Sequence, residues 1–569
     1  MAKQNKTDLQ NIPAAAARFI NRVIKKMRYR KKIRRDVQVE LVAHFEDELK
    51  DCATDQEKDQ KAQQLIADFG DAKLLAVLLR RAKKRCRPFW RTVAARTLQI
   101  TGLLALCLGL YVFWFYSGEP VITTDYAAQL SRLVRPPADE SQNAAPFYRK
   151  AGEMLAKVPD ETANLLGWKP SELTPDQRRT IREFFAGNTD MFDLITVAAS
   201  KPYYWEEYEA NNDGFLTPMT GLSKFRRFAF ALRLRAYDAA ERGRYEAALG
   251  DLKSMCRLAR HLRNGKTFIE LLVGTAIDHL AVKTLYEILA EHQIDSPLLA
   301  VLQADFEQIS ATEDVAQNLT AERLFAYDVI QRTFTGGRDG HVIPRKIKLL
   351  YPEVRVIGIG SSGFAGTLPA EDTSRNWFLE LTSDAFDQAR GFVGDQAHLL
   401  FAHPDKQETI QCAEQLYELW EHLALKTPAQ IRAEGTNPQE KAMEIAKGNL
   451  LLEPSVGASV SVMGFIHRRR ATVQAAPVVI AAMRYRSDKG FYPENLQELL
   501  TTGYLKELPM DPYSDKPLVY KKTDDNFTIY SLGPNFQDDA GQPGKTEKGQ
   551  IADWRDNGDT VFWPVPKTR

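Results

Sequence analysis

The sequence predicts a mostly α-helical protein with one transmembrane helix and a small α+β module at its C-terminal end. Three observations carry this prediction. Most of the chain shows apolar residues at helical spacing, residues 97–116 form an uncharged apolar run, and residues 511–535 combine prolines, tyrosines and alternating apolar residues. A length of 569 residues predicts several domains.

Composition and charge restrict the class of protein. The content of 44% hydrophobic and 26% charged residues excludes a wholly disordered or collagen-like chain. The mean hydropathy of -0.36 excludes a polytopic membrane protein. Residues 1–96 hold 24 Lys and Arg against 12 Asp and Glu, and the remainder holds 52 against 62. This asymmetry indicates that the two parts face different surroundings.

Residues 1–96 are expected to form a basic cytoplasmic helical domain. Two apolar stripes at three- and four-residue spacing are predicted, at Phe19, Ile20, Val23, Ile24 and Met27 and at Val37, Leu41, Phe45 and Leu49. A third helical segment breaks at Gly70, where Asp71 is placed to cap the next helix. The order of a basic first helix, "ELVAHFEDEL" and "ADFGDAKLLAVLL" resembles HAAS-type domains over about sixty residues. This resemblance implies regulatory or signalling contacts inside the cell.

Residues 18–35 carry ten basic residues and no acidic residue. Nucleic acid is one candidate partner for such a run, but no recognisable DNA-binding or RNA-binding module accompanies it. Next to a membrane, basic helices contact anionic lipid headgroups, so lipid or a solvated face is favoured and no nucleic acid is expected.

Residues 97–116, "TLQITGLLALCLGLYVFWFY", are long enough to cross the hydrocarbon core as a helix. Eight basic residues precede this run from Arg80 onward, and Glu119 and Asp125 follow it. The positive-inside rule therefore predicts a cytoplasmic N-terminus and an extracytoplasmic C-terminus in a single-pass inner-membrane protein. Residues 1–17 have no apolar core, so an uncleaved signal-anchor is expected.

Residues 117–466 are expected to form an extracytoplasmic helical domain. Within "FALRLRAYDAAERGRYEAALGDLKSMCRLARHL", Gly243 separates two helices that resemble one tetratricopeptide-type hairpin, although no second copy is found at the required period. The segment "KTFIELLVGTAIDHLAVKTLYEILAEH" has an apolar face so broad that it must be buried. On this segment His279 is expected to be a core histidine.

Other motifs are weak candidates for chemistry. Gly358, Gly360 and Gly363 form a G-x-G-x-x-G, but no helix follows at once, so an external loop is favoured over a dinucleotide site. His398 and His403 have the wrong spacing to share one helical face as metal ligands. The aromatic and acidic residues 203–215 fit surface packing better than a carbohydrate or cation site. No catalytic residue and no cofactor site other than calcium is predicted.

Residues 467–569 predict an α+β module. A helix over 468–486 ends near Gly490, a short helix follows Pro493, and strands at 517–522 and 527–532 flank the turn "TDDN". Alternation places Phe527 and Ile529 on one face of the second strand and Thr528 and Tyr530 on the other.

This segment resembles the globular part of the major pseudopilin of type II secretion over about ninety residues. The resemblance is carried by Gly490, Tyr492, Pro493, Leu496, Leu505, Pro509, Asp511, Pro512, Pro517, Tyr520, Phe527, Tyr530, Ser531, Leu532 and Gly533. A pseudopilin, however, has its apolar assembly helix at the N-terminus, whereas here residues 117–466 separate the apolar run from the module. The module therefore resembles that family in fold, and fold alone does not confer function.

In the pseudopilin family the loop after the last strand binds calcium through acidic side chains. That resemblance makes Asp538, Asp539 and Asp553 candidate calcium ligands, because calcium prefers carboxylate oxygens. The family's tight loop is replaced here by a longer segment containing "GQPGKTEKG", so a solvated loop is the alternative.

The expected role is that of an envelope component that binds, assembles or regulates, with protein partners in the envelope. An accessory component of a type II secretion or pilus-like system is the first alternative, and an extracytoplasmic hydrolase is the second. An enzyme would gather acidic residues with shifted pKa values in one external pocket. A disulfide between the external Cys256 and Cys412 stays open, because their separation in sequence gives no geometry.

Overall fold

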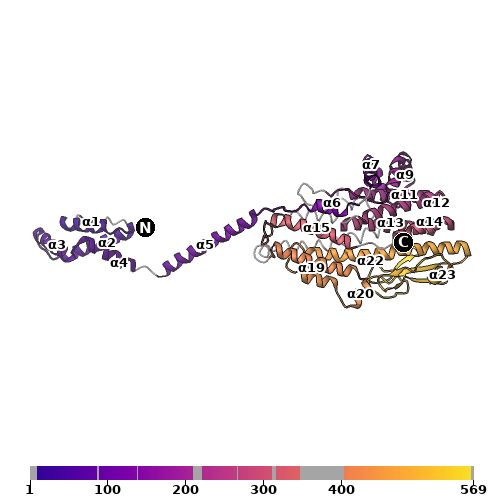
Figure 1. Ribbon diagram of the computed structural model, residues 1–569. Helices are drawn as coiled ribbons and strands as arrows, with labels where there is room; N and C mark the ends of the chain where they lie inside the picture. The colour runs from indigo at the N-terminus through magenta and orange to yellow at the C-terminus, as the bar shows by residue number, and fades with distance from the viewer. Residues whose placement is uncertain are drawn as a thin grey trace. The chain divides into compact units, whose positions relative to one another are not determined.

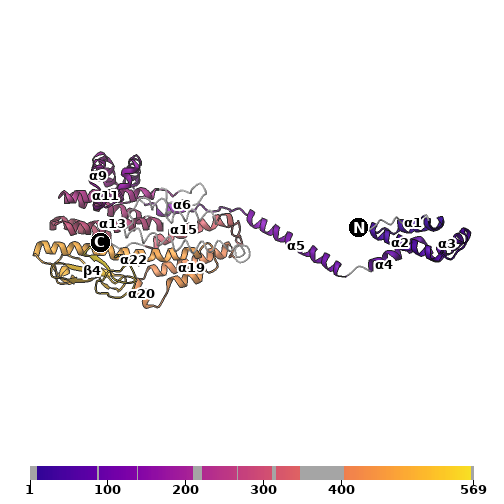
Figure 2. The ribbon, with the colours of Figure 1, turned by 180° about the vertical axis from the view of Figure 1, so that it is seen from behind.

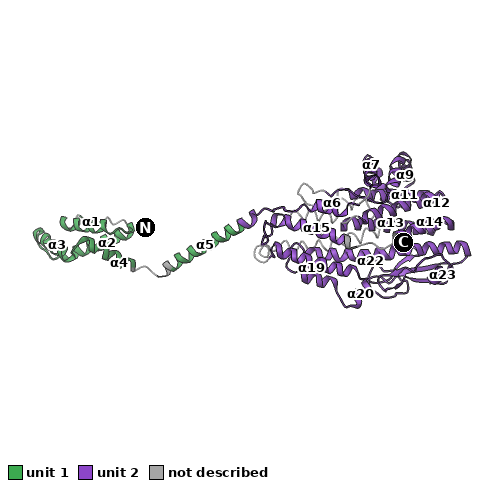
Figure 3. Ribbon diagram, viewed as in Figure 1, with its two compact units in different colours: residues 1–113 green, residues 114–569 purple. Residues whose placement is uncertain are grey.

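This computed structural model describes residues 9, 11–85, 89–136, 139–208, 221–264, 267–310, 315–346 and 403–565. The described chain is mostly helical, as the sequence predicts (Figure 1). It forms two compact units, residues 1–113 and 114–569, each of which is described by itself (Figure 3).

The first unit contains a small helical core. Its helices are α1 (Ala14–Lys26), α2 (Lys31–Glu48), α3 (Asp55–Phe69) and α4 (Ala72–Arg85). Both predicted stripes are buried except for Ile24, which is partly buried. Thr54 and Glu57 form a capping box at the start of α3. The Asp71 carboxylate accepts a hydrogen bond from the Lys73 N–H at 3.0 Å, which confirms the predicted cap.

Helix α5 (Phe89–Ser117) is, among the described residues, the one helix long and apolar enough to cross a membrane. It begins before and ends one residue after the predicted run 97–116. Most of its large apolar side chains are exposed, with Leu98 at 75% and Phe113 at 73%. Such a surface is stable in lipid and costly in water.

The last residues of α5, from Trp114 onward, belong to the second unit and contact a segment of that unit around His341. The His341 ring lies 4.3 Å from the Trp114 ring and 4.7 Å from the Phe115 ring, measured between centroids. Its Nε2 is 3.2 Å from the Phe115 carbonyl oxygen, and Arg345 donates to the Gly118 carbonyl oxygen at 2.8 Å. Burial lowers the pKa of His341 and favours the neutral ring. The chain that follows α5 is therefore held by specific contacts.

The helical part of the second unit consists of helices that pack on one another along the chain. Its helices are α6 (Tyr126–Val134), α7 (Ala145–Leu155), α8 (Asp160–Leu165), α9 (Pro175–Gly187), α10 (Thr189–Ser200), α11 (Leu222–Glu241), α12 (Tyr245–Arg263), α13 (Phe268–Glu291), α14 (Ser296–Ser310), α15 (Val315–Thr333), α19 (Lys406–Ala424), α20 (Pro428–Ala433) and α21 (Pro438–Ala446). Between α11 and α12, Gly243 has φ +69°, which confirms the predicted break. Helix α13 is buried along most of its length, also as predicted.

Helix α22 (Val456–Lys489) joins the helical part to the C-terminal strands. It packs against α13 and α14 and also contacts β4 (Phe527–Ser531) and β5 (Thr560–Trp563) (Figures 1 and 2). It starts twelve residues before the predicted helix 468–486, because tertiary packing continues the helix N-terminally. Pro477 lies inside it, and Gly490 ends it with φ +89°, as predicted.

The C-terminal module contains the short helix α23 (Leu496–Thr501) and two antiparallel sheets. Strands β1 (Met510–Asp511) and β2 (Lys516–Pro517) form one, and β3 (Val519–Lys522), β4 (Phe527–Ser531) and β5 (Thr560–Trp563) form the other in that order. The predicted hairpin is confirmed, with Lys522 opposite Phe527, but its first strand begins at Val519 instead of 517. Strand β5 was not predicted.

One hydrophobic core runs through the second unit from Ala144 to Trp563. It includes buried residues of α7, α12, α13 and α22, and also Phe527 and Ile529 of β4. The predicted boundary between residues 466 and 467 falls inside α22 and within the reach of this core.

A buried ion cluster links three helices. Asp278 of α13 accepts hydrogen bonds at Oδ2 from Arg263 of α12 and, at 2.7 Å, from Nε of Arg469 of α22. The side chains of Arg263 and Asp278 are each 1% exposed and that of Arg469 is 7% exposed. Charged groups at this depth are tolerated only when they are paired.

We predict that Asp278→Ala destabilises the second unit by about 3–5 kcal/mol, because it removes a carboxylate shared by two buried guanidinium groups. Urea denaturation of the full chain measures this change. The control is Asp176→Ala, which removes an 85% exposed partner of Arg179 and is expected to cost less than about 1 kcal/mol. Equal losses in the two variants would contradict the prediction.

Candidate functional site

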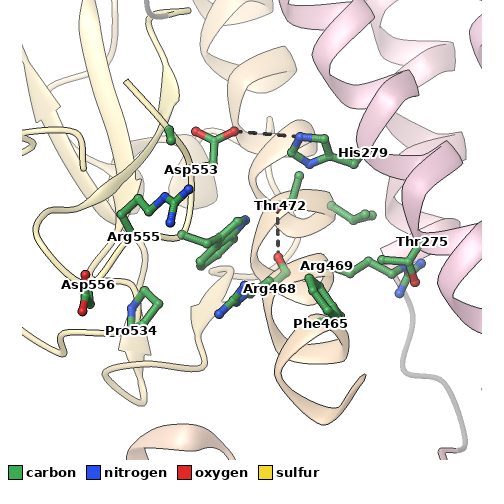
Figure 4. Close-up of a pocket in the computed structure, with 13 residues that line it drawn as sticks. Thr275, His279, Phe465, Arg468, Arg469, Thr472, Pro534, Asp553, Arg555 and Asp556 are labelled. Atoms are coloured by element: carbon green, nitrogen blue, oxygen red, sulfur yellow. Dashed lines mark hydrogen bonds and ion pairs between the residues drawn. The ribbon is translucent and has the colours of Figure 1, made fainter. Parts of the chain in front are cut away.

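A cavity of ≈ 340 Å³ lies between α13, α22 and the loop that precedes β5 (Figure 4). We call it the α13–α22 cavity. Its walls include Thr275 and His279 of α13, Arg468, Arg469 and Thr472 of α22, and residues 552–556 of the loop. Its size is in the range of small-molecule sites.

Helical spacing explains which residues of α22 line this cavity. Phe465, Arg468, Arg469 and Thr472 follow each other at intervals of three, one and three residues, which places them on one face of the helix. The Thr472 hydroxyl donates to the carbonyl oxygen of Arg468 at 2.9 Å. This face of α22 presents an aromatic ring, two guanidinium groups and a hydroxyl group together.

The two arginines of α22 have different surroundings. Arg469 is held by Asp278 in the buried ion cluster. Arg468 stacks on Phe465, with its Cζ atom 5.3 Å from the ring centroid. Its Nε atom is buried and has no hydrogen-bond acceptor among the described residues. A buried, unsatisfied donor of a cation is costly and favours an acceptor supplied from outside.

The loop wall is held in place by its own contacts. Trp554 has φ +62° and donates its backbone N–H to Thr560 Oγ1 at 3.0 Å. Its ring lies 5.6 Å from Tyr513 and 6.0 Å from Phe562. A side chain at Gly544 would bring its Cβ within 2.7 Å of Arg555 Cβ, so this close approach requires glycine. The loop conformation that presents Arg555 is therefore specified by packing.

His279 lines the cavity and is not a core histidine, contrary to the sequence prediction. Its side chain is 23% exposed, and its Nε2 lies 3.8 Å from Asp553 Oδ2 across the upper part of the cavity in Figure 4. The apolar pattern of α13 predicts burial, but the helix is covered at this position by a polar loop instead of another apolar helix.

A smaller cavity of ≈ 80 Å³ adjoins the first and shares His279, Thr472 and Asp553 with it.

The three candidate calcium ligands divide between two places. Asp553 faces His279, whereas Asp538 accepts a hydrogen bond from the Tyr530 hydroxyl at 2.8 Å. The Asp539 carboxylate accepts from the Asn535 side chain at 2.7 Å. Within the described ranges, no group of three or more His, Cys, Asp or Glu side chains is arranged to hold a metal ion. Calcium binding stays a prediction.

A buried acid near this loop was missed by the sequence analysis. Asp559 accepts backbone hydrogen bonds from Gly541 at 2.7 Å and from Asp539 at 3.3 Å. Burial, with a smaller contribution from the nearby Asp539 and Asp538 carboxylates, raises the pKa of Asp559 to about 6. The carboxylate of Asp559 therefore anchors the loop between β4 and β5.

The glycine motif, the two histidines and the two cysteines that the sequence analysis considered have separate outcomes. Gly358, Gly360 and Gly363 lie outside the described residues, as does His398. His403 accepts a hydrogen bond from the Leu450 N–H at 3.2 Å, a structural contact. Cys256 is buried and Cys412 is partly buried, and both are free thiols, so the structure shows no disulfide between them.

The arginines of the cavity were missed by sequence reasoning. The signal that could have found them is the run "HRRR", residues 467–470, inside an otherwise apolar and small-residue helix. A basic run at that place is unusual for a buried helix and needs partners or a ligand. Arg555 lies in a polar loop and carries no such signal.

Comparison of the chain with protein-family models, with curated proteins and with solved structures gives no match. The pseudopilin and HAAS resemblances therefore stay predictions that rest on the residues quoted for them. Function is therefore inferred from the geometry of the α13–α22 cavity.

The calcium hypothesis predicts that millimolar CaCl₂ raises the Tm of the full chain and that Asp538→Ala with Asp539→Ala removes this rise, because the two variants remove oxygen donors. Calorimetry with and without chelator measures the effect. MgCl₂ is the control for ionic strength. The absence of a rise, or an equal rise in the double variant, would contradict calcium binding.

Proposed function

We propose that this chain is a single-pass component of the bacterial envelope that binds a ligand or partner through its extracytoplasmic unit. The observation that carries the proposal is the α13–α22 cavity, whose walls come from the helical bundle and from the C-terminal module at once. The membrane anchor in the proposal is α5. Its flanking charges support a cytoplasmic N-terminus, an inner-membrane location and contact of residues 18–35 with anionic lipid.

A cavity between two parts of one unit is a common place for a binding site, because each part contributes walls that the other lacks. Here α13 and α22 supply rigid helical walls, and the loop before β5 closes the third side. The backbone hydrogen bond of Trp554 to Thr560 and the contact of its ring with Tyr513 hold this loop against the module. A preformed site loses less entropy on binding than one that must be ordered first.

A second candidate is an accessory role in a type II secretion or pilus-like system. The observation that favours it is the order of elements in the C-terminal module, namely the long helix α22, the short helix α23 and an antiparallel hairpin. This order agrees with the pseudopilin resemblance. In that case the surface of the module, and not the cavity, would contact partners.

We predict that a membrane-impermeant maleimide labels Gln497→Cys in intact spheroplasts, because Gln497 is exposed on α23 and this unit is proposed to be external. The native Cys52, which is partly exposed in the first unit, is expected to react only after permeabilisation. Mass shifts on gels measure the labelling. Labelling of Cys52 from outside would contradict the proposed topology.

Binding through the cavity is tested by in-cell cross-linking and mass spectrometry of the native chain and of Ala552→Phe. Ala552 is buried in the cavity wall, so a phenyl group there occupies the space of a ligand. Ala433→Phe, at an exposed position of α20, is the matched control. We expect Ala552→Phe alone to lose the cross-linked partner or ligand, since only this variant fills the site.

An unchanged set of cross-links in Ala552→Phe, with the native Tm retained, would contradict binding through the cavity. Cross-links to secretion or pilus components through residues 490–535, unaffected by Ala552→Phe, would favour the second candidate. The two outcomes differ in the peptides that carry the cross-link.

A further inference from the structure

We propose that the α13–α22 cavity binds a small organic molecule through a carboxylate or phosphate group, with Arg468 as the principal contact and Arg555 as the second. This inference rests on the proposed function, because it names the chemical class of ligand for the same cavity. It is based on the side chains of three wall elements and on the Nε donor of Arg468, which has no acceptor among the described residues.

Positive and hydrogen-bond-donating groups dominate the walls. Arg468, Arg469 and Arg555 supply three guanidinium groups, and Thr275 and Thr472 supply hydroxyl groups. The acidic residues of the walls are Asp553, which lies near His279, and Asp556, which is exposed. Guanidinium groups bind carboxylates and phosphates with two parallel hydrogen bonds.

Arg468 is the residue best placed to make this contact. Its neighbours in the described chain are the Phe465 ring and the Tyr513 hydroxyl instead of a carboxylate. Its Nε donor is buried and has no acceptor among the described residues. An oxyanion in the cavity would compensate the charge of this partly buried guanidinium group, which has no carboxylate partner in the described chain.

Arg469 has a different role from Arg468. Its Nε donates to Asp278 at 2.7 Å, which fixes its side chain and ties the cavity wall to the buried ion cluster. We therefore treat Arg469 as a positioning residue. The same interaction fixes the rotation of α22 about its axis, so that Arg468 and Thr472 face the cavity.

The rest of the wall favours an organic body over a bare inorganic ion. Phe465, Val473, Pro534, Ala552 and Trp554 contribute apolar and aromatic surface. A volume of ≈ 340 Å³ holds roughly 10–20 non-hydrogen atoms, more than a phosphate ion fills. In a partly enclosed site of this kind, the attraction between guanidinium and oxyanion is stronger than in water.

Three probes of similar shape test the proposal by calorimetric titration of the full chain in lipid nanodiscs. Benzoate presents a carboxylate, phenyl phosphate presents a phosphate, and benzamide is the neutral control. We expect saturable binding of at least one anion with a Kd below about 1 mM. Benzamide is expected to bind at least about tenfold more weakly, because it lacks the charge. Whether benzoate or phenyl phosphate binds more tightly identifies the headgroup.

Variants connect this binding to the named residues. Arg468→Gln is expected to weaken the anion at least about tenfold, and Arg468→Lys is expected to weaken it less, because Lys keeps the charge but not the paired donors. The matched control is Arg179→Gln at a 70% exposed surface position, where we expect no change. Arg555→Gln provides a second cavity variant if Arg468→Gln lowers the Tm strongly.

Equal affinity for benzamide and the anions, unchanged affinity in both Arg468→Gln and Arg555→Gln, or no saturation below about 10 mM would overturn the oxyanion proposal. Loss of cross-links in Ala552→Phe without any anion binding would leave the cavity as a binding site for another ligand class. Failure of the proposed function itself would instead appear as cross-links that Ala552→Phe does not change.

Discussion

The second unit depends on one buried carboxylate. Asp278 of α13 is shared by Arg263 of α12 and Arg469 of α22, so three helices meet at a single carboxylate oxygen atom, Oδ2. Charges buried this deeply are stable only with their partners, which makes the relative position of these helices a strict requirement.

Helix α22 transmits this constraint to the rest of the unit. One side of it packs on α13 and α14, and another contacts β4 and β5, so the bundle and the strands share a continuous core. Because Asp278 fixes Arg469, the neighbouring Arg468 and Thr472 have a defined direction. The cavity is a consequence of this arrangement, since the loop before β5 covers α22 without filling the space beside it.

The second unit therefore combines a well-packed interior with one polar group, the Nε of Arg468, that has no hydrogen-bond acceptor among the described residues. The buried ion cluster and the apolar core hold the helices, while Arg468 keeps an unused donor next to an open volume. In the proposed topology this volume lies outside the membrane, in a unit whose first residues after α5 are fixed by His341.

The sequence by itself determined the helical class, the apolar helix and the local elements. Periodicity identified the stripes of the first unit, the break at Gly243, the burial of α13 and the hairpin around β3 and β4, because these depend on neighbours a few residues apart. Only tertiary structure decided that β5 pairs with β4, that His279 faces Asp553, and that Asp553 lies apart from the Asp538 environment. Arg468 and Arg555 are 87 positions apart in the chain, and no short-range pattern relates them. They share one cavity because folding places the loop before β5 against α22.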